Sequence, residues 1–280
     1  MGTMIALLLV LGTLSGCAGG SMTNVKNAMP EALEDLPAYV VELSEWSGSR
    51  ENDQGDLMVA CSYQIPVLNV LDKNGLPLTE AHTPEEARAL QTAAAFNAQF
   101  DQWRDGSPML DELWEDAETF EETFQFTATM TDELICSVYQ SDHFISVSGN
   151  YYGYSGGAHG NTILLSWNFD LETGSFFDSQ LLENGTDLQK AVCQELEAQA
   201  EAKAAEAGLP PEEYLWADYA DILAEWSSYA VSFDKNGMTV GFSPYELACY
   251  AAGPQVFHLS YDSLRPHLGR EARLFLGLDP

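Results

Sequence analysis

Short runs of the chain alternate apolar and polar residues, which is the period-two pattern of half-buried antiparallel strands. Strands of this kind are predicted at 124–130, 134–139, 144–149 and 163–169. Apolar-rich strands are predicted at 56–68 and 256–260, and a hairpin at 230–233 and 238–242. The turn sequence Asp-Lys-Asn-Gly occurs twice, once after the run 56–68 and once inside the hairpin.

Helix signals lie between the groups of strands. Thr83, Pro84 and Glu86 provide an N-cap, a proline in the first turn and a capping-box partner, and they predict a helix to about Trp103. Further helices are predicted at 108–122, 186–208, 210–226 and 261–268. Strands and helices follow no regular βαβ order, so the sequence predicts an α+β fold with antiparallel sheets and packed helices.

Residues 1–17 have the features of an export signal. The apolar run from Met4 to Leu14 is shorter than the ~20 residues of a membrane span. Leu14-Ser-Gly-Cys17 resembles the bacterial lipobox, although no Lys or Arg precedes Lys26. We expect a lipid on Cys17, anchorage to the outer face of the bacterial membrane, and a tether over residues 18–54; a buried strand is the alternative for the apolar run.

The formal net charge of −32 limits the class of partner. Nucleic acids and anionic membrane surfaces attract basic proteins, so neither is expected to bind this chain by charge. A cationic protein would be attracted instead. Charge alone does not define a site.

Four cysteines remain if Cys17 is acylated: Cys61, Cys136, Cys193 and Cys249. An even number in an exported protein permits disulfides, with three connectivities. Their spacing matches no zinc motif, and a chain of this length can bury its own core without bridges. The sequence is compatible both with disulfides and with free buried thiols.

The segment 148–161 combines tyrosines, glycines and one histidine in a turn between two predicted strands. Strand alternation places Tyr152 and Tyr154 on one face and Tyr151 on the core face. His159 lies among glycines and could hold the turn, contact a ligand or bind a metal ion. No HExxH motif or close cluster of ligands accompanies it, so no metal and no cofactor is predicted.

A second loop, 244–254, is bounded by proline and glycine and contains Tyr245 and Tyr250. Aromatic side chains with a polar tip are favoured at binding surfaces. An architectural role for this loop and a binding role are both open.

Two patterns in the sequence resemble catalytic motifs. Gly153–Gly157 matches G-x-S-x-G around Ser155, but a nucleophile elbow needs a helix after the turn, and here a strand is predicted. The carboxylates of the predicted helix 108–122 lie on one element, whereas a glycosidase needs two that converge in a pocket. The acidic run therefore indicates a solvated face.

Four motifs carry a family resemblance: Gly156–Gly160, Asn168–Gly174, Phe242–Ala248 and Tyr250–Gln255. They resemble the RsiV-like and PdaC-like extracellular domains, a family that includes lysozyme-sensing and deacetylase-associated modules. The resemblance runs from about Gly55 to Leu268. It implies two intertwined subdomains, PdaC-like over 55–160 and RsiV-like over 161–280.

The resemblance implies an extracytoplasmic binding or sensing protein without catalysis of its own, and the lipobox at Cys17 adds the expected lipid anchor. Its ligand would be lysozyme or cell-wall glycan, and the expected contact residues are Tyr152, Tyr154, His159, Tyr245 and Tyr250. The alternative is a cell-envelope hydrolase that acts on peptidoglycan or esters through Ser155 or a metal ion at His159.

Overall fold

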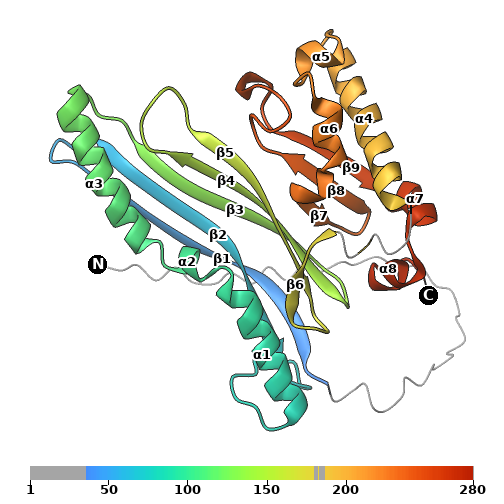
Figure 1. Cartoon of the computed structure of the whole chain (residues 1–280). Coiled ribbons are helices and arrows are strands. Elements are labelled where there is room, and N and C mark those ends of the chain that lie inside the picture. Colours follow the sequence, from blue (N-terminus) through green and yellow to red (C-terminus); the bar gives the residue numbers. More distant parts are fainter. Residues whose placement is uncertain (1–35, 180–181, 183–186, 280) are drawn as a thin grey trace, which may run out of the picture. The chain divides into compact units, whose positions relative to one another are not determined.

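The structure is a computed structural model that describes residues 36–179, 182 and 187–279, with two β-sheets and several helices (Figure 1). The predicted lipidation site Cys17 and the first part of the predicted tether lie outside the described residues. Within the described residues, no helix combines the length and the apolar composition needed to cross a membrane. The α+β fold class is confirmed.

The larger sheet has six strands in the order β1-β2-β3-β4-β5-β6. Their bounds are β1 Ala38–Glu51, β2 Leu57–Leu71, β3 Met130–Gln140, β4 Phe144–Tyr154, β5 Asn161–Asp170 and β6 Ser175–Phe177. β2 and β3 run parallel and the other neighbours are antiparallel. The sheet is therefore mixed, because the three helices between β2 and β3 carry the chain back to the end where β2 began.

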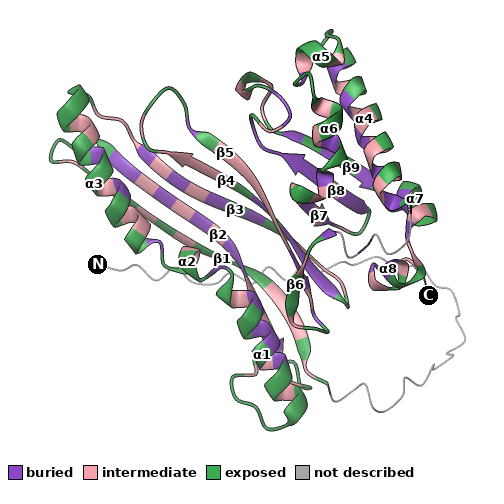
Figure 2. Cartoon of the chain, in the orientation of Figure 1, coloured by how far each residue is buried: buried purple, intermediate pink, exposed green. Residues whose placement is uncertain are grey.

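Helices α1 (Pro84–Ala98), α2 (Asp101–Arg104) and α3 (Ser107–Phe124) contact β2 and contribute to the core of this sheet. The predicted capping box is present at Thr83 and Glu86. Buried positions alternate with partly buried ones along β2 (Figure 2). The helix predicted to reach Trp103 is interrupted after Ala98.

The predicted tether is wrong where β1 lies. β1 pairs with β2 along its full length, from Ala38 opposite Leu71 to Glu51 opposite Leu57. Only partly buried and exposed side chains occur along β1. The strand is held by backbone pairing rather than by an apolar face, so it left no strong strand pattern in the sequence.

The strand predicted at 124–130 is also wrong. α3 continues through Phe124, Gln125 ends it with a φ of 58°, and β3 begins at Met130. Buried Leu113 and Ala117 have the spacing of a helix face. Phe124, seven residues after Ala117, continues that face two turns further instead of starting a strand.

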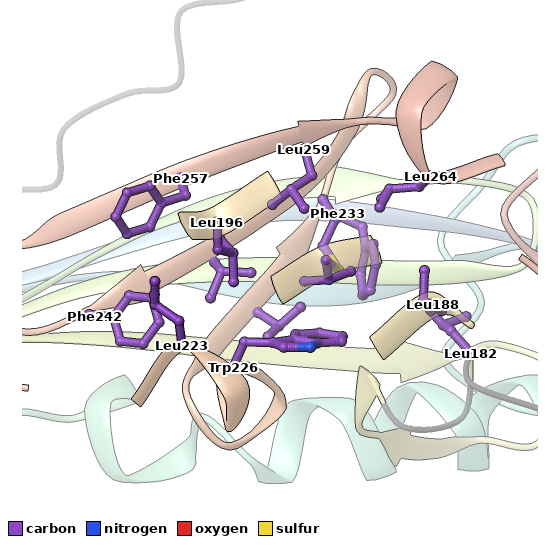
Figure 3. Packing of buried hydrophobic residues seen from close by; sticks show 14 of the residues in the cluster. Leu182, Leu188, Leu196, Leu223, Trp226, Phe233, Phe242, Phe257, Leu259 and Leu264 are labelled. Atoms are coloured by element: carbon purple, nitrogen blue, oxygen red, sulfur yellow. The ribbon is translucent and has the colours of Figure 1, made fainter. Parts of the chain in front are cut away.

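The second sheet has the order β7-β8-β9, with β7 Ala230–Phe233, β8 Gly237–Phe242 and β9 Gln255–Ser260. The predicted hairpin and last strand are confirmed. Trp226, Phe242, Phe257, Leu196 and Leu223 belong to its buried core (Figure 3).

Helices α4 (Leu188–Glu206), α6 (Tyr219–Ala224) and α7 (Tyr261–Leu264) supply the other side of this core. The remaining short elements are α5 Pro211–Tyr214, η2 Trp226–Ser228, η3 Tyr250–Ala252, η4 Arg265–His267 and α8 Arg270–Phe275. The single helix predicted at 210–226 is broken, because Leu215 is extended and buried.

Side chains of the larger sheet bind the backbone of β7. The Asn168 amide donates to Val231 O at 2.8 Å and accepts a hydrogen bond from the Ser146 hydroxyl at 2.7 Å. The Phe233 N–H donates to Ser146 Oγ at 2.7 Å, and the Val231 N–H donates to Ser166 Oγ at 2.9 Å. The free edge of β7 is thus capped, which removes a site for unwanted strand pairing.

Candidate functional site

The loop between β4 and β5 meets the loop between β8 and β9 at three aromatic residues, His159, Tyr245 and Tyr250, named here the tyrosine–histidine cluster. The His159 ring stacks on Tyr250 with centroids 3.8 Å apart and 21° between the planes. The Tyr245 ring lies 5.7 Å from Tyr250, and its hydroxyl lies 3.4 Å from His159 Nε2. Residues from both sheets therefore form one surface group.

One backbone oxygen anchors the cluster. The Tyr250 hydroxyl donates to Gly160 O at 3.0 Å, and His159 Nδ1 lies 2.8 Å from the same oxygen. Since a carbonyl only accepts, His159 carries a proton on Nδ1. In the neutral ring, Nε2 is then an acceptor that faces the hydroxyl of Tyr245. A Cβ at Gly160 would lie 2.3 Å from the Tyr152 ring, so a larger residue there would displace that tyrosine.

Tyr245 has an unusual backbone. Its φ is 73°, in the left-handed region that a bulky residue rarely adopts. Hydrogen bonds hold it there: its N–H donates to Ala248 O, and the Trp216 indole donates to its carbonyl, both at 3.0 Å. Its side chain is nevertheless 53% exposed. Such strain costs about 1–3 kcal/mol and is found preferentially at binding and active sites.

Tyr152 and Tyr154 were expected to share one face that contacts a ligand, but in the structure both pack within their own loop. Both are partly buried. The Tyr152 ring packs over Gly160, and the Tyr154 hydroxyl donates to Gly157 O at 3.0 Å. They support the loop that carries His159. Their contact with a ligand stays a prediction, as does that of the three cluster residues.

The geometry offers little to the catalytic alternative. Ser155 is exposed, and the turn around it leads into strand β5 rather than a helix. Among the described residues, no hydrogen bond joins Ser155 to His159, whose two ring nitrogens face Gly160 and Tyr245. Within the described ranges of the chain, no group of three or more His, Cys, Asp or Glu side chains could hold a metal ion.

A second tyrosine group lies inside the protein and was missed in the sequence. Asp132 is buried and accepts hydrogen bonds from the Tyr63 hydroxyl, at 2.7 Å, and from the Tyr151 hydroxyl. Burial, reinforced by the bond to Asp132, raises the pKa of both phenols. The placement of Tyr151 on the core face is confirmed. Tyr63 reaches Asp132 because β2 and β3 lie side by side with Cys61 opposite Asp132. This pairing joins residues that are far apart in the sequence, so no local pattern predicts it.

The cysteines have distinct environments. Cys61 and Cys136 are buried, Cys193 donates a weak hydrogen bond to Leu223 O, and Cys249 is exposed. Burial raises the pKa of the Cys136 thiol to about 12 and also raises that of Cys61. These two thiols are therefore unreactive at neutral pH.

Comparison with known proteins finds a match to part of the chain. A family model described as "Protein of unknown function (DUF3298)" matches residues 179–262. Tyr245 and Tyr250 lie within the matched residues, and His159 lies outside them. No curated protein matches the chain.

Two solved structures are similar to the chain. A DUF3298 family member from Bacteroides fragilis has a TM-score of 0.60 and 14% identity, with 86% of this chain and 97% of that chain covered. A DUF3298 family protein from Pseudomonas aeruginosa has a TM-score of 0.44 and 16% identity, with 86% and 98% covered. The first likeness establishes a shared fold and nothing about the ligand.

Proposed function

We propose that this protein is a lipid-anchored, extracytoplasmic binding protein whose ligand surface is the tyrosine–histidine cluster. The observation that carries the proposal is Tyr245: a strained backbone, fixed by hydrogen bonds, presents an aromatic side chain that is 53% exposed. A core residue gains burial in return for strain, and Tyr245 does not. Binding a ligand supplies that burial.

The leading partner is a cationic protein, with C-type animal lysozyme as the first to test. The net charge of −32 accelerates encounter with a basic protein, and the RsiV-like and PdaC-like motifs point to a lysozyme-sensing family. Cell-wall glycan is the other ligand that the resemblance implies. Aromatic rings with polar tips suit either surface.

Salt separates a specific complex from charge attraction. Exposed charges are screened over ~8 Å at physiological salt and over a shorter range at ~0.5 M. Titration calorimetry with several C-type lysozymes and with purified peptidoglycan should find binding that persists at ~0.5 M salt. Tyr245→Ala should weaken that binding at least tenfold, which is ~1.4 kcal/mol. The proposal fails if no ligand of either class binds at that salt, or if Tyr245→Ala binds as tightly as wild type.

The anchor is tested separately. Expressed from its full gene, the wild-type protein should enter the detergent phase on phase partitioning, whereas Cys17→Ala should stay in the aqueous phase. Equal release of both proteins into the aqueous phase would remove lipidation and leave the ligand proposal untouched.

A further inference from the structure

Three phenylalanines form an exposed apolar surface at the end of α3: Phe120, Phe124 and Phe126, named here the phenylalanine patch. Phe124 is 58% exposed and Phe126 is 56% exposed. Phe120 lies 4.6 Å from Phe124 and 5.2 Å from Phe126 between ring centroids. Exposed aromatic residues in contact with one another mark interaction surfaces.

The patch is exposed because α3 is longer than the sheet beneath it. Glu121 of α3 already lies within hydrogen-bond distance, 3.4 Å, of Asn52 in the turn between β1 and β2. The apolar face of the helix continues to Phe124, one turn beyond the level of that strand end. No described element covers this last turn, so Phe124 and Phe126 pack on Phe120 and face outward.

The surroundings of the patch are strongly acidic. α3 carries seven carboxylates and no Lys or Arg, and of these Asp111 is paired with Arg50 of β1; they are Asp111, Glu112, Glu115, Asp116, Glu118, Glu121 and Glu122. The sequence has no Lys or Arg at all between Arg104 and Lys190. A partner that buries the patch must therefore bring positive charge to its rim, since like charges would oppose the contact.

The patch adjoins the loop of the tyrosine–histidine cluster. A Cβ on Gly156 would lie 2.7 Å from the Phe120 ring, so the β4–β5 loop passes directly against the patch. His159 lies three residues further along the same loop. A protein that contacts His159 is thus close enough to reach Phe120 as well.

We propose that the phenylalanine patch is a second docking surface for a cationic protein, which covers the three rings with an apolar surface flanked by Lys or Arg. The proposal rests on the proposed function in taking the partner to be a cationic protein. A second copy of this chain is disfavoured, because two acidic α3 helices would face each other. An anionic membrane surface is disfavoured for the same reason.

The test uses two synthetic peptides of equal charge, one amphipathic with leucine and lysine, the other polylysine. The full chain should bind the leucine–lysine peptide about tenfold more tightly than polylysine at ~0.5 M salt, because only the first covers the rings. Phe124→Ser/Phe126→Ser should lose that preference. Leu76→Ser/Leu209→Ser, which alters two exposed leucines elsewhere, should keep it.

Lysozyme distinguishes this proposal from the proposed function. If lysozyme binding is lost in Tyr245→Ala and unchanged in the double-serine variant of the patch, the cluster stands and the patch is not a docking surface for that partner. If lysozyme does not bind at all, the peptides still test the patch. Retention of the leucine–lysine preference by Phe124→Ser/Phe126→Ser overturns the inference.

Two other results would also overturn it. Sedimentation that finds a wild-type dimer and a monomeric Phe124→Ser/Phe126→Ser variant would make the patch a contact between copies. Binding of the Cys17→Ala chain to phosphatidylcholine vesicles, abolished by the same two substitutions, would make it a membrane contact.

Discussion

Two groups of tyrosines in this protein use their hydroxyls in opposite ways. In the core, Tyr63 and Tyr151 both donate to the buried carboxyl group of Asp132. At the surface, Tyr245 and Tyr250 join His159, and only Tyr250 has its hydroxyl bound to the backbone. The core group satisfies all its polar atoms internally. The surface group leaves one ring exposed on a strained residue.

This difference separates a stabilising role from a binding role. A buried polar group without a partner is costly, so the core tyrosines are needed for folding. At the surface, Tyr250 is partly buried, but Tyr245 is exposed on a strained backbone, so its arrangement calls for another explanation. We therefore expect substitutions in the core group to change stability strongly and those in the surface group to change binding.

The largest effect is expected for Tyr63→Phe/Tyr151→Phe. It removes both hydrogen-bond donors from the buried carboxyl group of Asp132, and each lost donor costs about 1–3 kcal/mol. Denaturant unfolding should report this loss. Tyr152→Phe is the matched control, because no hydrogen bond of the Tyr152 hydroxyl occurs among the described residues, and its stability should change by less than ~0.5 kcal/mol.

Alkaline pH should reveal the same two phenols. Burial raises the pKa of Tyr63 and Tyr151 in the folded state above the ordinary value of ~10. The folded protein then keeps protons that the unfolded chain loses, so the contribution of these two phenols to stability is constant below pH ~10 and falls as pH rises further. The limiting slope is about 1.4 kcal/mol per pH unit for each phenol. Tyr63→Phe/Tyr151→Phe should show a shallower fall; an equal slope in both proteins would contradict the assignment.

His159→Ala should cost less, about 0.5–1.5 kcal/mol, through the lost stacking on Tyr250 and the lost bond to Gly160. Thermal unfolding measures this change. Tyr250→Phe keeps the stacked ring and removes only the hydroxyl, so it should be less destabilising. An unchanged melting temperature in His159→Ala would mean that the histidine has no structural role.

The smallest effect on stability, and the most diagnostic, is expected for Tyr245→Gly. Glycine adopts a φ of 73° without strain, so the change should leave stability within ~1 kcal/mol or raise it. Gln125, with a φ of 58°, provides the matched control Gln125→Gly. Binding should be lost only in Tyr245→Gly. A large loss of stability in that variant would assign Tyr245 to the fold rather than to a ligand.

Local signals in the sequence predicted local structure well. Thr83 and Glu86, three residues apart, form the capping box that begins α1. Gly208 adopts the positive φ that is common just after the end of a helix. The alternation around Phe124 and Phe126 misled, because a short apolar run fits a strand and the end of a helix equally. The apolar positions that continue at helical spacing from Leu113 onward distinguish the helix end from a strand.

Contacts between distant residues could not be predicted. β1 is a strand only because β2 lies beside it, and its own side chains carry little signal. His159 and Tyr245 are both candidate contact residues in the sequence, but they are 86 residues apart and no sequence pattern predicts that they touch. Asp132 was not noticed, since its two tyrosine partners come from other strands.

We expect the surface tyrosines to bind a ligand and the core tyrosines not to. Nuclear magnetic resonance of the chain with labelled tyrosine rings, titrated with C-type lysozyme and with peptidoglycan fragments at ~0.5 M salt, tests it most directly. We predict that the signals of Tyr245 and Tyr250 shift with one of these ligands and that those of Tyr63 and Tyr151 stay in place. Unchanged Tyr245 and Tyr250 signals in the presence of bound ligand would contradict the account.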